Sequence, residues 1–122
     1  MTAKTVLTID DSRTMRDMLR MTLAEAGYRV VQAVDGVHGL EMLENETPDV
    51  IITDINMPRL DGYGVIEGVR RDGRHRATPI LVLTTETDSA KKDRARQAGA
   101  TGWIVKPFDP NKLISAVRRV QA

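Results

Sequence analysis

Residues 6–13, VLTIDDSR, place two adjacent aspartates, Asp10 and Asp11, directly after a run of aliphatic and β-branched residues. Such a run is typical of a short buried strand. Two like charges at the end of a buried strand repel each other, and their removal from water is costly unless a positive charge lies near. Two explanations are open at this point. One of the aspartates caps a following helix, or the pair holds a cation.

The composition narrows the class of protein. The 122 residues are enough for one domain with a core, and the net charge is only +1. A dedicated nucleic-acid binder is usually more basic and richer in aromatic residues, so we expect no nucleic-acid partner. The chain has no cysteine. His38 and His75 lack zinc-site spacing, and we expect both to be surface residues. No segment resembles a signal peptide or a membrane span, so we expect a cytoplasmic protein.

Short apolar runs alternate with amphipathic stretches along the whole chain. The runs expected to form strands are 5–9, 29–33, 49–53, 80–83 and 102–105. The stretches expected to form helices are 13–26, 36–44, 62–71, 89–98 and 110–120. Gly27 and Gly99 follow two of these helices as typical C-terminal stops. This alternation predicts an α/β fold, with a doubly wound five-stranded parallel sheet in a single domain over residues 1–122.

Polar residues follow four of the predicted strands. Asp10 and Asp11 follow the first, Asp54 the third, Thr84 the fourth and Lys106 the fifth. In open parallel sheets, ligands bind beyond the carboxyl ends of the strands. If the strand order is 2-1-3-4-5, these four ends are contiguous and form one pocket.

The chemistry of such a pocket is specific. Three carboxylates in one place require a proton or a cation, and oxygen ligands favour Mg²⁺ or Mn²⁺ over zinc. Asp54 is then a candidate nucleophile toward phosphorus, because carboxylates form aspartyl-phosphates. The metal and Lys106 would neutralise charge on the transferring group, and the Thr84 hydroxyl would bond a phosphate oxygen. Taken singly, these residues have ordinary explanations, such as a helix cap, a turn, a surface lysine and a β-former.

Several motifs together identify a family. The chain resembles the receiver domains of two-component response regulators over essentially its full length, and the single-domain chemotaxis regulators in particular. The motifs are DDSRTMR (10–16), AVDGVHGL (33–40), TDINMPRLDG (53–62), LTTE (83–86) and AGATGWIVKPF (98–108). The resemblance implies a flavodoxin-like (βα)5 fold with the strand order 2-1-3-4-5.

The resemblance also implies roles for the residues of the pocket. Asp54 would accept a phosphoryl group from a phosphohistidine of a chemotaxis-type histidine kinase. Asp11 would bind Mg²⁺ directly, and Asp10 would act nearby or through water. Asn56 would bind the ion through its backbone carbonyl, with Asp54 as a further ligand. Thr84 and Lys106 would contact the phosphoryl group. The peptide bond before Pro107 would be cis.

A switch and an output surface are implied as well. Receivers usually carry Tyr or Phe three residues before the lysine, where this chain has Trp103. Thr84 would move toward the phosphoryl group and open space for Trp103 to turn inward. The output surface would be helix four, strand five and helix five, which carry seven basic residues: Lys91, Lys92, Arg94, Arg96, Lys112, Arg118 and Arg119.

The expected partner of this surface is the flagellar motor switch protein, and the alternative is a phosphate sink or another single-domain receiver. We expect a monomeric signalling module rather than an enzyme with a separate substrate. A hydrolase with an Asp nucleophile needs a second Asp two residues later, where this chain has Asn56. A flavodoxin-like electron carrier needs more aromatic residues to hold a flavin. A fragment of a DNA-binding regulator is a further alternative. The absence of a linker after the last helix leads us not to expect it, although a truncated chain would look the same.

Overall fold

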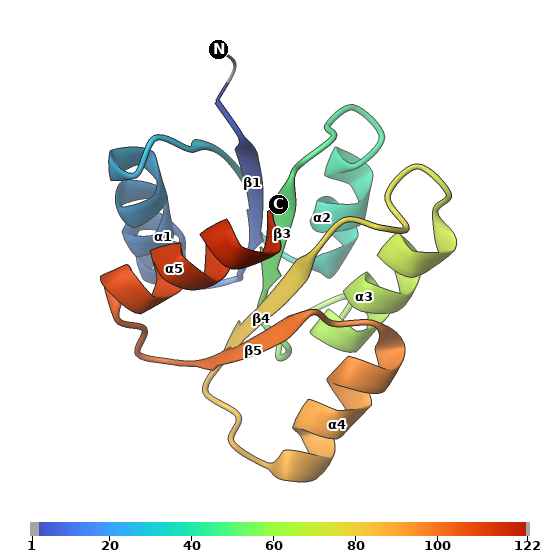
Figure 1. The fold of residues 1–122 in the computed structure, drawn as a ribbon. Coiled ribbons are helices and arrows are strands. Elements are labelled where there is room, and N and C mark those ends of the chain that lie inside the picture. Colours follow the sequence, from blue (N-terminus) through green and yellow to red (C-terminus); the bar gives the residue numbers. More distant parts are fainter. Residues whose placement is uncertain (1–2, 122) are drawn as a thin grey trace.

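The computed structural model describes residues 3–121, which form one parallel sheet between two layers of helices (Figure 1). The strands are β1 (Thr5–Ile9), β2 (Arg29–Ala33), β3 (Val50–Thr53), β4 (Ile80–Thr84) and β5 (Gly102–Val105). Their order in the sheet is β2-β1-β3-β4-β5, and every pair is parallel. The expected α/β class and the strand order 2-1-3-4-5 are therefore confirmed.

The helices are α1 (Arg13–Glu25), α2 (Gly36–Met42), α3 (Gly62–Arg71), α4 (Ser89–Ala98) and α5 (Pro110–Val120). Helices α1 and α5 cover one face of the sheet, and α2, α3 and α4 cover the other (Figure 1). Each face has its own core. Leu19, Leu23 and Leu113 lie in the first core, and Val65 and Ile66 lie in the second.

Each helix begins at a residue whose side chain accepts a backbone N–H of the first turn. These N-caps are Ser12, Asp35, Asp61, Asp88 and Asp109. Such caps satisfy donors that have no partner inside the helix, and each is worth about 1 kcal/mol. Gly27 and Gly99 have the positive φ of a left-handed residue, so both predicted glycine stops are confirmed.

The ends of the elements differ from expectation by one or two residues. Helix α2 ends at Met42 rather than Glu44, because Leu43 N–H bonds the carbonyl of Leu40, three residues back, and tightens the last turn. Strand β4 continues to Thr84, where it pairs with Val105 of β5. Within the described residues, no helix has the length and apolarity needed to cross a membrane.

One prediction about a side chain is wrong. His75 is not a surface residue, because it is 2% exposed and its Nε2 lies 2.9 Å from the carbonyl oxygen of Leu43. The turn after α3 folds back over the end of α2 and encloses the ring. His38 is half-buried, and its Nδ1 accepts the backbone N–H of Val34.

Candidate functional site

The carboxylates of Asp10, Asp11 and Asp54 converge at the carboxyl ends of β1 and β3. One oxygen of each lies within 4.8 Å of the others. Asp10 is 2% exposed and Asp54 is 8% exposed, whereas Asp11 lies on the surface. The pocket thus has two charged groups in its floor and one at its rim. The carboxyl ends of β1 and β3 therefore lie side by side, as expected from the sequence.

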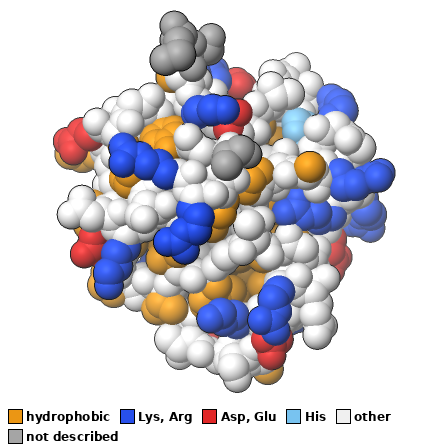
Figure 2. All heavy atoms as spheres, in the orientation of Figure 1, with side chains coloured by type: hydrophobic (Ala, Val, Ile, Leu, Met, Phe, Trp, Pro, Cys, Tyr) orange, Lys and Arg blue, Asp and Glu red, His pale blue; other side chains and the backbone are white. Residues whose placement is uncertain are grey.

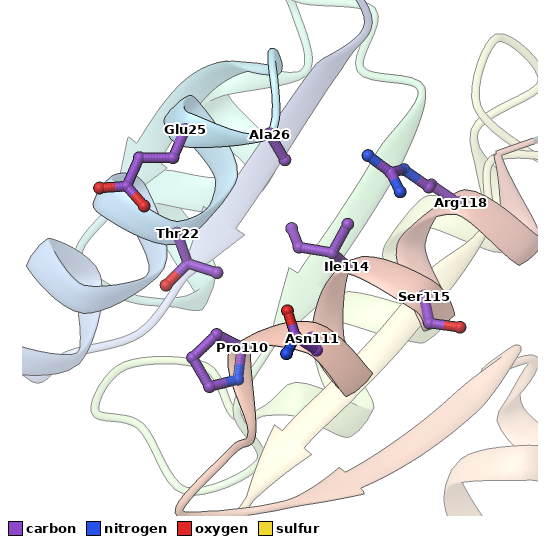
Figure 3. A pocket seen from close by; sticks show the side chains of 8 residues that line it. All are labelled: Thr22, Glu25, Ala26, Pro110, Asn111, Ile114, Ser115 and Arg118. Carbon is purple, nitrogen blue, oxygen red and sulfur yellow. The ribbon is translucent and has the colours of Figure 1, made fainter.

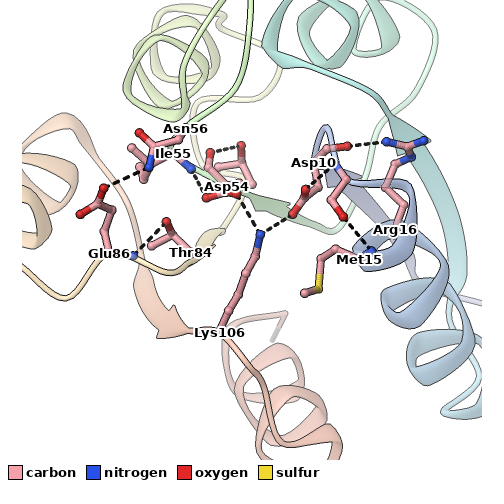
Figure 4. A network of polar contacts seen from close by, with 11 residues as sticks. Asp10, Met15, Arg16, Asp54, Ile55, Asn56, Thr84, Glu86 and Lys106 are labelled. Atoms are coloured by element: carbon pink, nitrogen blue, oxygen red, sulfur yellow. Dashed lines mark hydrogen bonds and ion pairs between the residues drawn. The ribbon is translucent and has the colours of Figure 1, made fainter.

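Lys106 joins the two buried carboxylates (Figure 4). Its Nζ lies 2.9 Å from Asp10 Oδ2 and 2.8 Å from Asp54 Oδ2. The lysine follows β5, and its backbone N–H bonds the carbonyl of Thr84. The peptide bond between Lys106 and Pro107 is cis, as expected.

Local backbone contacts fix the two buried aspartates. Asp10 Oδ1 accepts the backbone N–H of Ser12 at 2.9 Å, and Asp54 Oδ1 accepts the backbone N–H of Ile55 at 2.6 Å. The cap of α1 is Ser12, whose Oγ accepts the N–H of Met15. Neither Asp10 nor Asp11 caps this helix, so the capping explanation of the stretch VLTIDDSR is excluded.

Burial and charge act in opposite directions on the ionisable groups of this pocket. Burial raises the pKa of Asp10, and the hydrogen bonds from Ser12 and Lys106 reverse only part of that rise. Burial alone lowers the pKa of Lys106, but its hydrogen bonds with Asp54 and Asp10 outweigh that effect and raise it. One ammonium thus serves two carboxylates, and the pocket keeps an excess of negative charge.

This donor set fits a hard divalent cation. Three carboxylates lie beside a single lysine, so a bound cation would offset the excess of negative charge that Lys106 leaves uncompensated. All the donor atoms are oxygens, which suits Mg²⁺ and does not suit metals that prefer thiolate or imidazole. Asp10, Asp11 and Asp54 would hold the ion, and Asn56 lies two residues after Asp54 at the exposed edge of the pocket.

Glu86 connects the pocket to β5 and α4, a connection that the sequence did not reveal. Its backbone N–H lies 3.3 Å from Thr84 Oγ1, and its carbonyl accepts the indole N–H of Trp103 at 3.3 Å. Its carboxylate accepts the Asn56 side-chain amide at 3.0 Å and pairs with Lys91 of α4 at 3.1 Å. Thr84 and Trp103, the two expected switch residues, therefore meet at one residue. Spacing in the sequence gave no sign of this.

Three of the basic residues of α4 have a partner within the structure. Lys91 pairs with Glu86, Arg96 pairs with Asp93 at 2.7 Å, and the Arg94 guanidinium lies 3.9 Å from the centre of the Tyr63 ring. Lys and Arg side chains are spread over the face drawn in Figure 2, with hydrophobic side chains between them. This face is therefore a mixed surface rather than a continuous basic patch.

An open groove of about 500 Å³ lies elsewhere, between α1 and α5 (Figure 3). Thr22 of α1 and the following Ala26 face Pro110, Ile114 and Arg118 of α5 across it. Arg118 belongs to the predicted output surface, but none of the residues of the acidic pocket lines this groove. The acidic site at the carboxyl ends of β1 and β3 is therefore separate from the groove between the helices.

Comparisons with known proteins agree with this architecture. Residues 6–118 match the model of the response regulator receiver domain. The structure of the chemotaxis protein CheY4 of Vibrio cholerae superimposes with a TM-score of 0.93 at 44% identity, covering 98% of this chain and 99% of that one. The receiver domain of the sensor histidine kinase PA1611 of Pseudomonas aeruginosa, with a magnesium ion coordinated in its active-site cleft, gives a TM-score of 0.91 at 27% identity over 98% of both chains.

A curated relative from another group is similar over a shorter part of its own length. The "Probable transcriptional regulator ycf27" of Guillardia theta is 41% identical over 119 residues, which are 98% of this chain and 46% of that protein. This chain thus spans about half the length of the ycf27 proteins that it matches. The similarities to all these proteins cover the acidic pocket, the parallel sheet and the five helices, and the chain belongs to the family of response regulator receiver domains.

Proposed function

We propose that this chain is a chemotaxis response regulator. It accepts a phosphoryl group from a phosphohistidine of a chemotaxis-type histidine kinase onto Asp54, with Mg²⁺ bound by Asp10, Asp11, Asp54 and the Asn56 carbonyl. Phosphorylation switches the surface of α4, β5 and α5 so that it binds the flagellar motor switch protein. The chain acts in the cytoplasm as a monomeric signalling module that catalyses its own phosphorylation and dephosphorylation.

The observation that carries the first part is the cluster of three carboxylates around one ammonium. Asp10, Asp11 and Asp54 lie within 4.8 Å of one another, and Lys106 contacts two of them. A structural ion pair needs only one carboxylate for one lysine. The surplus of acidic groups is costly for the fold unless a cation binds there and compensates its charge.

The chemical step is a transfer of phosphorus from nitrogen to oxygen. A carboxylate oxygen of Asp54 forms the new P–O bond while the P–N bond to the donor imidazole breaks, and the electron pair of that bond leaves with the imidazole nitrogen. Mg²⁺ held by Asp10, Asp11 and Asp54 would supply positive charge to the oxygens of the transferring group. The Lys106 ammonium, already 2.8 Å from Asp54, adds a second positive charge, and the Thr84 hydroxyl offers a hydrogen-bond donor.

The direct test is intact mass after incubation with acetyl phosphate and Mg²⁺. The wild-type chain should gain one labile phosphoryl group, the Asp54→Asn variant none, and chelation of the metal should abolish the adduct. Asp93→Asn, which changes an exposed aspartate of α4, should behave like the wild type. A metal-independent adduct, or one that survives in Asp54→Asn, would contradict the proposal. Steady release of phosphate without an adduct would mean that turnover outruns detection.

The contacts of Glu86 support the output part of the proposal. A phosphoryl group that draws in the Thr84 hydroxyl competes with the 3.3 Å contact between Thr84 and the Glu86 backbone. Trp103 bonds the carbonyl of the same residue, and Lys91 of α4 pairs with its carboxylate. A shift of Glu86 would therefore reach both β5 and α4. The similarity to CheY4 supports chemotaxis as the setting.

The output is tested with the phosphorylated chain and two partners. Binding to a motor switch protein that strengthens on phosphorylation and is lost in Asp54→Asn would support the proposed output. Rapid return of the phosphoryl group to the kinase, without binding to the motor switch, would instead identify a phosphate sink. Sedimentation with and without acetyl phosphate tests whether the chain stays monomeric.

A further inference from the structure

The loop between β3 and α3 carries both Asp54 and Asn56, and its shape therefore decides where two proposed metal ligands lie. The loop contains one strained residue. Arg59 has φ of +67°, in the left-handed region that glycine adopts without penalty and arginine rarely adopts. The N–H of Leu60 bonds the carbonyl of Pro58 at 2.8 Å, so Arg59 is the centre of a tight γ-turn. Something must hold this conformation in place.

The holding contact is a two-pronged ion pair across 24 residues of sequence. Arg59 Nε donates to Asp35 Oδ2 at 2.7 Å, and Nη2 donates to Asp35 Oδ1 at 3.0 Å. Paired parallel bonds of this kind fix the orientation of both groups as well as their distance. A lysine could not make them, because it has no planar fork.

The partner of Arg59 is itself rigid. Asp35 is 7% exposed, and it caps α2 by accepting the N–H of His38 at 2.8 Å. The pKa of Asp35 is lowered to about 2, first by the hydrogen bonds from Arg59 and then by that from His38, so the carboxylate stays charged at neutral pH. Beside the pair, the backbones touch, because a Cβ on Gly36 would overlap the Leu60 carbonyl. The start of α2 is therefore a fixed platform for the loop.

The other end of the loop is fixed by the phosphoacceptor strand. Gly62 N–H bonds the carbonyl of Ile55 at 2.8 Å, and a Cβ on Gly62 would overlap the carbonyl of Asp54. The loop is thus closed at its base by the bond between Gly62 and Ile55, and it is held near its middle by the ion pair of Arg59 with Asp35. Asn56 lies between these two fixed points, and its side chain is exposed.

We infer that Arg59 is a positioning residue for the metal site. Its ion pair with Asp35 holds the β3–α3 loop in the one shape that presents the Asn56 carbonyl toward the acidic pocket. This inference rests on the proposed function, because it concerns the same Mg²⁺ site. Arg59 acts through the backbone and contacts neither the metal nor the phosphoryl group. The platform that it uses comes from β2 and α2, which carry none of the proposed ligands.

The test compares the Mg²⁺ affinity of variants by titration calorimetry, without any phosphodonor. Arg59→Gly removes the ion pair and also removes the steric penalty of the positive φ, so the variant should fold as well as the wild type. We expect its Mg²⁺ Kd to rise about threefold to tenfold, less than the ~10–100-fold that follows loss of a residue bonded directly to a metal ligand. The Mg²⁺ Kd of Arg59→Lys should lie between those of the wild type and Arg59→Gly. A merely structural role predicts no loss of affinity on relief of the strain.

Two further variants isolate the ion pair. Asp35→Asn keeps a residue that caps helices well, but it removes the charge and one of the two oxygens that accept from Arg59, so it should raise the Kd by a similar factor. The double variant Asp35→Asn/Arg59→Gly should be no worse than either single one, because both remove the same interaction. Arg74→Gly is the matched control, because Arg74 also pairs with an aspartate, Asp72, but in the loop between α3 and β4. Its Kd should be that of the wild type.

Hydrogen exchange supplies a readout that needs no metal. The Gly62 amide, which closes the base of the loop, should exchange about tenfold faster in Arg59→Gly and at the wild-type rate in Arg74→Gly. A Kd that stays within twofold of the wild type in Arg59→Gly, or an equal rise in Arg74→Gly, would overturn the inference and leave the proposed function intact. Failure of the wild-type chain to bind Mg²⁺ at all would overturn both.

Discussion

Helices α3 and α4 are neighbours of equal length on one face of the sheet, but they are held in different ways. Helix α3 buries Tyr63, Val65, Ile66 and Val69, whereas α4 buries only Ala95. The side chains of α4 are otherwise small, polar or charged. Apolar burial, which dominates stability, therefore fixes α3 strongly and α4 weakly.

Polar contacts hold α4 against its neighbours where apolar contacts are lacking. Lys91 pairs with Glu86, the Lys91 carbonyl accepts the Tyr63 hydroxyl at 3.3 Å, and Arg94 covers the Tyr63 ring. Contacts of this kind are individually small, so a change at the pocket that moves Glu86 is large enough to compete with them. Packing therefore holds α3 more firmly than α4, and α4 is the helix that the proposed switch would move.

The largest expected effect comes from the core of α3. Ile66 is fully buried, so Ile66→Ala removes packed atoms and leaves a cavity. We expect the free energy of unfolding to fall by about 2–5 kcal/mol, measured by urea denaturation. Gln97→Ala, on the exposed side of α4, should change it by less than about 0.5 kcal/mol. Similar losses in the two variants would show that α4 is as firmly packed as α3.

A smaller effect is expected where α4 rests on Tyr63. Arg94→Ala removes the guanidinium that lies 3.9 Å from the ring centre, and such a contact is worth about 0.5–1 kcal/mol at an exposed site. The loss should appear as faster hydrogen exchange in α4, with α3 unchanged. Lys92→Ala, on the same helix, serves as the control. Faster exchange in α3 as well would mean that the two helices open together.

The smallest effect is expected on acidification. Hydrogen bonds from Asn56 and Lys91 lower the pKa of Glu86 below its usual 4.5. The native state therefore binds fewer protons than the unfolded state, and the contribution of Glu86 is present above pH 4.5 and is lost as the pH falls below that value. Trp103 fluorescence should report this step, because its indole bonds the Glu86 carbonyl. The step should disappear in Glu86→Gln, and its persistence there would assign it to another group.

Much of this architecture could be predicted from the sequence. Runs of Val and Ile between capped helices placed all five strands and helices within two residues of their observed ends, because these signals are local. The motifs at the strand ends identified the acidic pocket for the same reason. The strand order was available only through resemblance, since local patterns do not encode which strands are neighbours.

The missed features all depend on distant contacts. His75 lies in the polar segment DGRHR (72–76), which is typical of an exposed turn, and only the fold shows that this turn closes over α2. Asp35 and Arg59 each fit an ordinary turn, and nothing in the sequence pairs them. The backbone of Glu86 joins Thr84 to Trp103 through main-chain atoms, which carry no sequence signal.

The most direct test of the account is hydrogen exchange of α3 and α4 with and without beryllofluoride and Mg²⁺, which together imitate a phosphorylated aspartate. We expect a changed exchange rate in α4 and around Trp103, an unchanged rate in α3, and no change anywhere in Asp54→Asn. Equal changes in both helices, or changes that persist in Asp54→Asn, would contradict the claim that Asp54 controls α4 through Glu86.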